Sequence, residues 1–242
     1  MSIRTLWIVV VSLLLVSAVF AGTVHAVGFN GFETTKVTLD NVRAYAPSVE
    51  DAGPSFAVVG GDLFVGEPGN WRQIQAPSGV IVSAVTIDPQ REDVVYIGAA
   101  NDLAIYRSDN AGQHWLRVPL SADYVGGVTG IAVDSVQRLV YVGTDTAGLF
   151  RLRDIGSSML VSGQLLLDEP VIEVVADSAG TGLVFARTAW NLYRAEDYGM
   201  RWISVDNLGT VATAVAIAQT KPAGVYVGTT DRGLLRSEDG LN

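Results

Sequence analysis

One short stretch of the sequence groups residue types that could do chemistry. It reads SDNAGQHW, with Ser108, Asn110, Gly112 and Trp115 at regular intervals. Such a string can form a catalytic loop, a metal-binding loop or a turn. The chain has no cysteine, which excludes cysteine nucleophiles and thiolate metal sites, and its two histidines leave little room for histidine-based triads or zinc sites.

An internal repeat accounts for this string better than a catalytic role does. Four aromatic residues recur 45, 44 and 41 positions apart, namely Tyr96, Tyr141, Phe185 and Tyr226. Four arginines recur 44, 43 and 42 positions apart, namely Arg107, Arg151, Arg194 and Arg236. A weaker copy begins at Phe56, and its Trp71 lies 44 residues before Trp115. The chain is therefore built from units of one recurring length.

Each unit reads as four short strands. The second unit contains VSAVTID (82–88), VVYIGA (94–99), AIYRS (104–108) and WLRV (115–118), separated by Pro, Asn, Asp and Gly. No helical period competes outside the N-terminal segment. A β-sandwich would not require arginines and aromatics at one period. The pattern predicts an all-β fold, a β-propeller of four-stranded antiparallel blades with one hydrophobic helix before it.

In this frame SDNAGQHW lies between the third and fourth strands of a blade. It returns as AEDYGMRW (195–202) and, cut short, as SEDGLN (237–242). The string resembles the Asp-box or BNR repeat, Ser-x-Asp-x-Gly-x-Thr-Trp, of sialidase-like and related propellers, and the resemblance covers the chain from about Phe56 to its end. The matching positions are Ser108, Asn110, Gly112, Trp115, Asp197, Gly199, Trp202, Ser237 and Asp239.

The physical role that we expect for these residues is a turn. The Asx side chain accepts hydrogen bonds from downstream N–H groups, Gly adopts a positive φ, and Trp buries its ring between sheets. The copies are imperfect, because Ala195 replaces the Ser, His114 and Arg201 replace the Thr, and Leu241 replaces the Gly. The third full repeat has LRDIGSSML and no box.

An exo-glycosidase of the sialidase type is the alternative function that the resemblance raises. It needs three convergent arginines, a tyrosine nucleophile with a carboxylate, and an acid. The family signature Arg-Ile-Pro precedes the first box, whereas the nearest string here, Arg117 to Pro119, follows a box on a predicted outer strand. Repeated arginines read as packing elements. The others, Arg43, Arg72, Arg91, Arg138, Arg187 and Arg232, form no recognisable arrangement.

We therefore predict no catalytic residues, no metal ligands and no cofactor. Asp102, Asp145 and Asp231 fall in loops between second and third strands, where calcium binding is conceivable but turn formation is the better interpretation.

The N-terminus predicts export. Arg4 precedes an apolar run from Leu6 to Phe20, and small residues follow, as in a secretory signal. Cleavage before Val27 is the first candidate and cleavage after Ala21 the second; an uncleaved anchor is the alternative, since the segment could span about 30 Å of hydrocarbon. We assign 1–26 to a signal peptide or membrane anchor and 27–242 to the propeller. The lone positive charge before the segment puts the rest on the exported side.

Charge and resemblance together predict a binding role. A net charge of −9 and a pI near 4.6 argue against nucleic acid or anionic lipid as partner. The resemblance includes non-enzymatic propellers: photosystem II assembly and stability factors, sortilin-type receptors and bacterial surface proteins. We expect an exported scaffold that binds protein or glycan, with membrane association only through its N-terminal segment. Candidate contact loops are 51–54, 123–127 and 177–181, facing a basic or neutral partner.

The last unit raises the question of ring closure. The units run about 41–77, 80–120, 125–168, 170–207 and 210–242, and the fifth stops within its box. One expectation is that this chain is part of a larger propeller of six to eight blades, in which case Leu234 or Val225 would be uncovered at an open end. The alternative is that TTKVTLD (34–40) supplies the missing outer strand, with Val37 and Leu39 paired against 234–237.

Overall fold

The structure is a computed structural model that describes residues 42–48, 53–67, 70–165, 167–218 and 224–238. The predicted signal peptide or anchor, the N-terminal hydrophobic helix, the segment 34–40 and Asp239 lie outside these residues. Within the described part, no helix is long and apolar enough to cross a membrane.

Five antiparallel sheets follow one another along the chain, each with its strands in sequence order. Blade 1 contains β1 (Val42–Ala46), β2 (Ser55–Val59), β3 (Asp62–Glu67) and β4 (Asn70–Ile74). Blade 2 contains β5 (Val82–Asp88), β6 (Arg91–Ala99), β7 (Ala104–Ser108) and β8 (Leu116–Pro119). Blade 3 contains β9 (Val128–Asp134), β10 (Leu139–Thr144), β11 (Leu149–Asp154) and β12 (Met159–Leu165).

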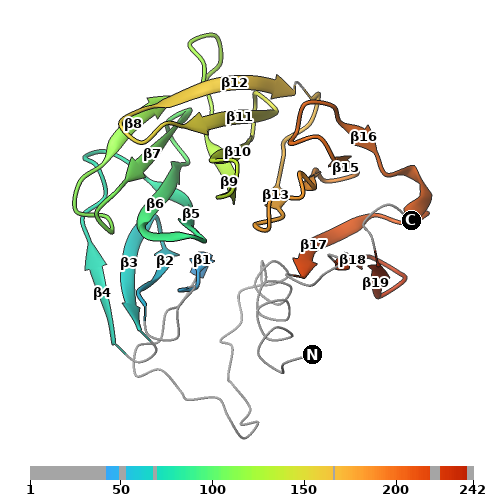
Figure 1. Ribbon diagram of the computed structural model, residues 1–242, viewed down its shortest axis with the longest axis horizontal. Coiled ribbons are helices and arrows are strands. Elements are labelled where there is room, and N and C mark those ends of the chain that lie inside the picture. The colour runs from blue at the N-terminus through green and yellow to red at the C-terminus, as the bar shows by residue number, and fades with distance from the viewer. Residues whose placement is uncertain (1–41, 49–52, 68–69, 166, 219–223, 239–242) are drawn as a thin grey trace, which may run out of the picture.

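The last two sheets are smaller. Blade 4 contains β13 (Glu173–Ala176), β14 (Val184–Arg187), β15 (Leu192–Ala195) and β16 (Ile203–Ser204), followed by the short helix η1 (Asp206–Leu208). Blade 5 contains β17 (Ala212–Ala218), β18 (Gly224–Thr229) and β19 (Leu234–Ser237), three strands among the described residues. Figure 1 shows the sheets arranged about a common axis, with β1, β5, β9, β13 and β17 innermost. The predicted β-propeller of about five antiparallel blades is confirmed.

The burial of the strands follows from this stacking. The second strand of a blade is covered on both faces, so β10 is buried along its whole length, as expected for a continuous apolar run. Outer strands are mostly exposed instead: in β8 Leu116 and Arg117 are exposed, and only Val118 is buried. The outer strand therefore has one face toward water, whereas the second strand of a blade has none.

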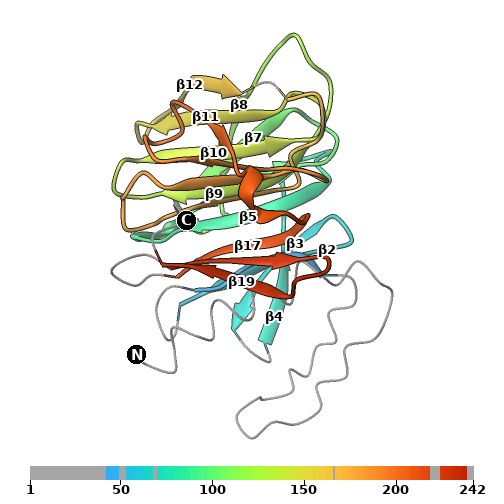
Figure 2. The same ribbon diagram turned by 90° about the vertical axis from the view of Figure 1, so that its right-hand side faces the viewer.

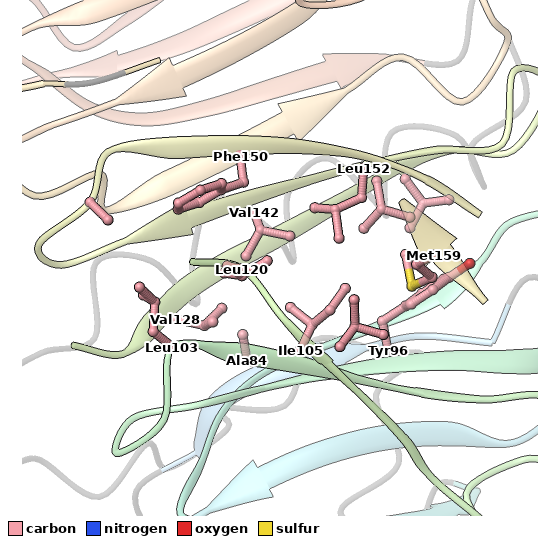
Figure 3. Close-up of a cluster of buried hydrophobic side chains, with 14 of the residues drawn as sticks. Ala84, Tyr96, Leu103, Ile105, Leu120, Val128, Val142, Phe150, Leu152 and Met159 are labelled. Carbon is pink, nitrogen blue, oxygen red and sulfur yellow. The ribbon is translucent and has the colours of Figure 1, made fainter. Parts of the chain in front are cut away.

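The core consists of layers between successive blades. The layer between blades 2 and 3 is drawn in Figure 3, where Tyr96 and Ile105 of blade 2 face Leu152 and Met159 of blade 3. Equivalent clusters lie between blades 1 and 2, 3 and 4, and 4 and 5. Figure 2, turned by 90°, shows the sheets stacked on one another, with the connection from β8 to β9 projecting beyond them. Each blade is thus stabilised mainly by its neighbours.

The sequence analysis expected Leu234 or Val225 to be uncovered in the fifth blade, and the structure separates the two residues. Leu234 is 55% exposed, as expected for an uncovered strand, but Val225 is 2% exposed and lies in the layer against blade 4. The expectation of an uncovered Val225 is wrong, because β18 packs on blade 4 whatever lies beyond β19. The alternative partners of β19, Val37 and Leu39, lie outside the described residues.

Candidate functional site

The antiparallel order of the strands defines two faces of the propeller. The turns between first and second strands and between third and fourth strands lie at one end, which we call the box face. The turns between second and third strands and the links to the next blade lie at the other end, which we call the entry face. Each candidate residue can be assigned to one of these faces.

On the box face, the turn of blade 2 closes on itself through hydrogen bonds. The Ser108 hydroxyl accepts from the N–H groups of Asn110 at 3.2 Å and Gly112 at 2.8 Å. The Asn110 side-chain oxygen accepts from the N–H of His114 at 2.8 Å and from the Ser108 hydroxyl at 2.9 Å. Ala111 and Gly112 both have positive φ. The side-chain oxygens of Ser108 and Asn110 are therefore used within the turn.

The turn of blade 4 has the same construction without the serine. The Asp197 carboxylate accepts from the N–H groups of Met200 at 3.1 Å and Arg201 at 2.9 Å. Tyr198 and Gly199 have φ of 59° and 72°. Arg201 stands at the position of His114, so the Asp197 carboxylate bonds to the N–H group that the Asn110 side chain bonds to in blade 2.

These turns also contact the preceding blade. A Cβ on Gly112 would lie 2.7 Å from Ile74 Cδ1, and a Cβ on Gly199 would lie 2.8 Å from Tyr141 Cε1. Both distances are too short, so each glycine is required by the neighbouring blade as well as by its own positive φ. Trp115 and Trp202 pack, half-buried, in the layers that join blade 2 to blade 1 and blade 4 to blade 3.

Blade 3, which has no box, uses a carboxylate in its place. Asp154 has a fully buried side chain. It accepts hydrogen bonds from Tyr96 Oη at 2.6 Å, Arg107 Nε at 3.0 Å and Arg91 Nη2 at 3.2 Å, all from blade 2. Its other oxygen accepts from the N–H of Gly156 at 2.7 Å. One side chain on β11 thus holds three polar side chains of the preceding blade.

A second buried carboxylate extends this cluster. Asp88 accepts from Arg91 Nε at 3.0 Å and Nη2 at 2.5 Å, from the N–H of Gln90 at 3.0 Å, and from the Ser135 hydroxyl of blade 3. We call Asp88, Arg91, Tyr96, Arg107 and Asp154 the interblade cluster. Two carboxylates balance two guanidinium groups, so the cluster buries no net charge.

The pKa values in the interblade cluster favour the ion-paired state. Burial, together with the hydrogen bond to Asp154, raises the pKa of the Tyr96 phenol far above its usual value. Burial alone would raise the pKa of Asp154, but the hydrogen bonds from Tyr96, the Gly156 N–H and Arg107 outweigh it and hold that pKa below the ordinary range. Tyr96 is therefore a protonated donor and Asp154 an ionised acceptor.

The interblade cluster contains the group types of a sialidase-type site, a tyrosine beside a carboxylate with two arginines, but it lacks access. Tyr96 and Asp154 are 0% and 1% exposed. A nucleophile needs a reachable oxygen and a lowered pKa, and Tyr96 has neither. Arg117 of the RVP string lies elsewhere, on the rim, where it pairs with Asp102 at 2.7 Å. The cluster joins blades and has no room for a substrate.

Sequence reasoning missed this cluster, and it missed a second ion pair beside the central axis. Arg187 of β14 donates to Glu173 of β13 at 2.8 Å, and Arg187 is buried. Arg91 and Arg187 had shown no arrangement in the sequence because their partners lie on other strands. A usable signal existed in Asp88, Asp134 and Asp177, which recur 46 and 43 residues apart at the ends of inner strands, all buried.

The proposed contact loops divide between the two faces. Residues 123–127 lie on the entry face, whereas 177–181 and the described part of 51–54 lie on the box face. Asp177 is 1% exposed and accepts from the Thr181 hydroxyl at 2.6 Å, so its assignment as an exposed contact is wrong. The Asp177 carboxylate is buried and already hydrogen-bonded within its own turn, so it cannot contact a partner.

The aspartates between second and third strands are engaged in local contacts. Asp102 pairs with Arg117, Asp145 accepts from the N–H of Gly127 at 2.7 Å, and Asp231 accepts from the Thr210 hydroxyl. Among the described residues, no group of three or more His, Cys, Asp or Glu side chains could hold a metal ion.

The entry face carries most of the exposed apolar side chains that lie in loops. Its members come from links between blades and from one hairpin, and they are Ile81 (51% exposed), Tyr124 (37%), Val125 (93%), Ile172 (43%) and Trp190 (74%). Carboxylates lie in the same loops, namely Asp123, Asp145, Asp168 and Glu169. Asn191 donates to Glu169 at 2.5 Å beside Trp190. We call these nine side chains the entry-face patch.

Nearby carboxylates influence Tyr193 on the same side of blade 4. Burial raises the pKa of the Tyr193 phenol, and the negative charges of Glu169, Asp168 and Asp206 raise it further. Three carboxylates therefore lie close enough to Tyr193 to disfavour its negatively charged form.

A separate hollow lies between blades 4 and 5. Its volume is about 250 Å³, and it opens at the rim. The apolar lining comes from both blades and includes Phe185, Leu192, Leu208, Val225 and Val227. Three arginines, Arg194, Arg232 and Arg236, also line it.

Solved structures with the same architecture support the fold. An ancestral GH74 enzyme superposes with a TM-score of 0.65 at 12% identity, over 84% of this chain and 31% of that one. The extracellular domain of a putative hybrid two-component system from B. thetaiotaomicron gives 0.62 at 15% identity, over 85% and 28%. YCF48 bound to D1 peptide gives 0.63 at 13% identity, over 87% and 69%.

At these identities the likeness shows the fold alone. The chain spans about a third of the length of the first two structures and about two thirds of the third. No known family model matches the chain, and no curated protein matches it.

Proposed function

We propose that this chain is an exported, non-catalytic propeller scaffold that binds a protein partner through the entry-face patch, in a role such as assembly or stabilisation of that partner. The observation that carries the proposal is the exposure of Trp190 and Val125, at 74% and 93%, in loops held by a rigid fold. Large apolar side chains exposed on one face of a rigid fold can provide a binding surface.

The loops of the patch are held in place, which lowers the entropic cost of binding. Asp145 accepts from the N–H of Gly127, and the Thr146 hydroxyl donates to the carbonyl of Val125 at 2.9 Å. In the hairpin of blade 4, the Thr188 hydroxyl accepts from the N–H of Asn191 at 2.9 Å. Preorganised loops lose little freedom when a partner docks.

The charge of the patch indicates the chemistry of the partner. Asp123, Asp145 and Asp168 are exposed, and Glu169 lies beside Trp190. A segment with lysine or arginine next to large apolar residues would pair with these carboxylates and place its apolar groups on Trp190 and Ile172. The net charge of −9 favours the same partner over long distances.

Three further considerations support the proposal. In the interblade cluster Tyr96, Asp154 and Arg107, group types that glycoside hydrolysis could have used, are buried. The N-terminal sequence predicts export. Among the structures with this fold, one is an extracellular domain and one has a bound peptide.

The test is a selection from a library of random twelve-residue peptides displayed on phage, with the full chain as bait. We expect selected peptides to combine Lys or Arg with large apolar residues, and to lose about tenfold or more in affinity for Trp190→Ala. Met200→Ala, which removes a 72% exposed side chain on the box face, is the matched control and should change nothing. Selected peptides that bind Trp190→Ala unchanged, or binding on a glycan array alone, would contradict the proposal.

A further inference from the structure

The two ends of blade 3 carry opposite charges at the surface. At the box end, Arg138 of the turn between β9 and β10 and Arg153 near the end of β11 are exposed. At the entry end, the hairpin of blade 3 and its links to blades 2 and 4 contribute the four carboxylates of the entry-face patch, which are Asp123, Asp145, Asp168 and Glu169. Blade 3 therefore has a basic end and an acidic end.

The carboxylates at the box end of blade 3 do not neutralise its arginines. Asp134 and Asp154 are each 1% exposed. Asp134 accepts from an N–H group of its own turn at 3.0 Å, and Asp154 is bound within the interblade cluster. Within the described part of the chain, neither Arg138 nor Arg153 has an ion pair. Both guanidinium groups can therefore pair with carboxylates of another molecule.

Exposed apolar side chains lie beside these two arginines. Val136 precedes Arg138 by two residues in the same turn, and Leu160 of β12 is directly opposite Arg153 of β11. Their exposed fractions are 48% and 53%, and that of Ile155, in the turn between β11 and β12, is 47%. We call Val136, Arg138, Arg153, Ile155 and Leu160 the blade 3 basic patch.

Backbone hydrogen bonds fix the two turns that carry the blade 3 basic patch. The N–H of Asp154 donates to the carbonyl of Arg138 at 2.9 Å, which joins the two turns. The N–H of Ile155 donates to the carbonyl of Ser158 at 3.0 Å. Arg138 has a φ of 55°, which is uncommon for a residue with a side chain. The patch is therefore preorganised, and docking on it costs little backbone entropy.

From these observations we propose that the blade 3 basic patch docks on the entry-face patch of a second copy of this chain. The inference rests on the proposed function, because it names the protein partner of the entry-face patch. That patch requires arginine or lysine beside large apolar residues, and the blade 3 basic patch presents both. The carboxylates of one copy pair with Arg138 and Arg153 of the next, and the apolar side chains of the two surfaces meet between them.

The two patches of one molecule cannot meet each other, because they lie at opposite ends of one sheet. The six residues of β10 separate these ends by about 20 Å. Contact between copies is therefore heterologous, and each copy retains one unused patch after docking. Repetition of this contact builds an open head-to-tail chain of copies, with blade 3 of one molecule above blade 3 of the next.

The total charge of the protein limits the strength of this association. A net charge of −9 makes copies repel one another over long distances. At physiological ionic strength the screening length is about 8 Å, so repulsion between centres about 20 Å or more apart is weak, whereas ion pairs at contact persist. Because the patches are small, we expect a dissociation constant of the order of 100 µM.

The test reverses the charges of each patch separately in the full chain. The first variant combines Arg138→Asp, a residue type that tolerates positive φ, with Arg153→Glu, and the second combines Asp123→Lys with Asp168→Lys. In sedimentation velocity at physiological ionic strength, each variant alone should associate about tenfold more weakly than the wild type. An equimolar mixture should recover the wild-type association, because the second variant keeps the blade 3 basic patch and the first keeps the entry-face patch.

A control variant separates the effect of the patches from that of net charge. Arg72→Glu combined with Arg232→Glu gives the same net charge as the first variant, at exposed positions of blades 1 and 5. This control should associate like the wild type. Association that persists in both reversal variants would belong to another surface, such as the N-terminal segment, and would overturn the proposal. A mixture that associates no more than its components would also overturn it.

Peptide binding distinguishes failure of this proposal from failure of the proposed function. The first reversal variant keeps the entry-face patch, so it should still bind the basic peptides that recognise Trp190. If it binds these peptides but does not associate with the second variant, the docking of a second copy is wrong and the proposed function stands. If Trp190→Ala changes neither peptide binding nor association of the wild type, both proposals are wrong.

Discussion

Two layers of the propeller join neighbouring blades by different interactions. One lies between blades 2 and 3, the other between blades 3 and 4. In the first, the Tyr96 hydroxyl of blade 2 donates to the buried Asp154 of blade 3. In the second, the Tyr141 ring of blade 3 is covered by Gly199 of the blade 4 turn, and its hydroxyl has no hydrogen-bond partner among the described residues. A repeat position therefore fixes the contact between blades but leaves its chemistry free to differ.

The difference predicts which layer is more vulnerable. A polar layer depends on every member of its network, because removal of one partner leaves the others buried and unsatisfied. An apolar layer with a turn across its end depends on shape and volume. The following predictions test this contrast, beginning with the largest effect.

Asp154→Ala should have the largest effect, a loss of about 3–5 kcal/mol in the free energy of unfolding. The substitution leaves Arg107, 5% exposed, and the Tyr96 hydroxyl without their acceptor. Urea denaturation followed by tryptophan fluorescence measures the change. Asp145→Ala, at an exposed loop position, is the control and should cost less than about 1 kcal/mol.

Trp202→Ala should follow, with a loss of about 3 kcal/mol, at the lower end of the range for buried aromatic residues because Trp202 is only half-buried. Met159→Ala removes the side chain at the start of β12, which packs in the layer between blades 2 and 3, and should cost about 2–3 kcal/mol. The same denaturation experiment compares them. A Trp202→Ala variant with wild-type stability would mean that the box tryptophan does not hold the apolar layer.

Gly199→Ala should cost about 2 kcal/mol, because the new Cβ would lie 2.8 Å from Tyr141 and the residue has a φ of 72°. Gly156→Ala in the unboxed turn is the matched comparison. Its φ is 90°, but no atom lies within 4 Å of the new Cβ, so only the backbone term of about 1 kcal/mol applies. Equal losses for both would show that Gly199 is needed for φ alone.

Two tyrosine substitutions should separate the layers directly. Tyr96→Phe removes a hydrogen bond to a charged acceptor and should cost about 1.5 kcal/mol. Tyr141→Phe removes a hydroxyl with no described partner and should be neutral or slightly stabilising. Thermal unfolding of the two variants side by side tests the prediction, and a larger loss for Tyr141→Phe would reverse the assignment of the layers.

The smallest effect that we expect is on the pH dependence of the free energy of unfolding. The folded-state pKa of Asp154 lies below its ordinary value, so its contribution is complete above the unfolded pKa and is lost as pH falls through the folded pKa. The gap in unfolding free energy between wild type and Asp154→Asn should therefore narrow as pH falls below about 4. Urea titrations at several pH values measure this gap, and a gap that widens with acid would contradict the assigned direction.

Much of the fold could be predicted because it is periodic. Residues such as Tyr96 and Tyr141, or Arg107 and Arg151, return at one interval, and that interval identifies blades without any knowledge of contacts. The turn at Asn110 and Gly112 could also be read locally, since an Asx side chain bonds to N–H groups a few residues on.

The interblade cluster could not be read in this way, because its partners are distant in sequence. Tyr96 and Asp154 are 58 residues apart, and Asp154 stands in a repeat that lacks the motif. The departure of blade 3 from the repeat was the signal for this cluster. Where blades 2 and 4 have a box turn that covers the preceding blade, LRDIGSSML has Asp154, whose side chain bonds to the preceding blade. The arginine period was read as packing, whereas Arg107 is also an ion-pair donor.

The dependence of each blade on the next one sets an order of assembly. The side chains Trp115, Met159 and Trp202 each cover the blade that precedes their own. A newly synthesised blade therefore has an uncovered face until about forty more residues have emerged. A chain that leaves a ribosome or an export channel from its N-terminus must therefore build this propeller progressively, one blade behind the emerging end. The transient species at each stage exposes the apolar face of its last blade, to which a chaperone could bind.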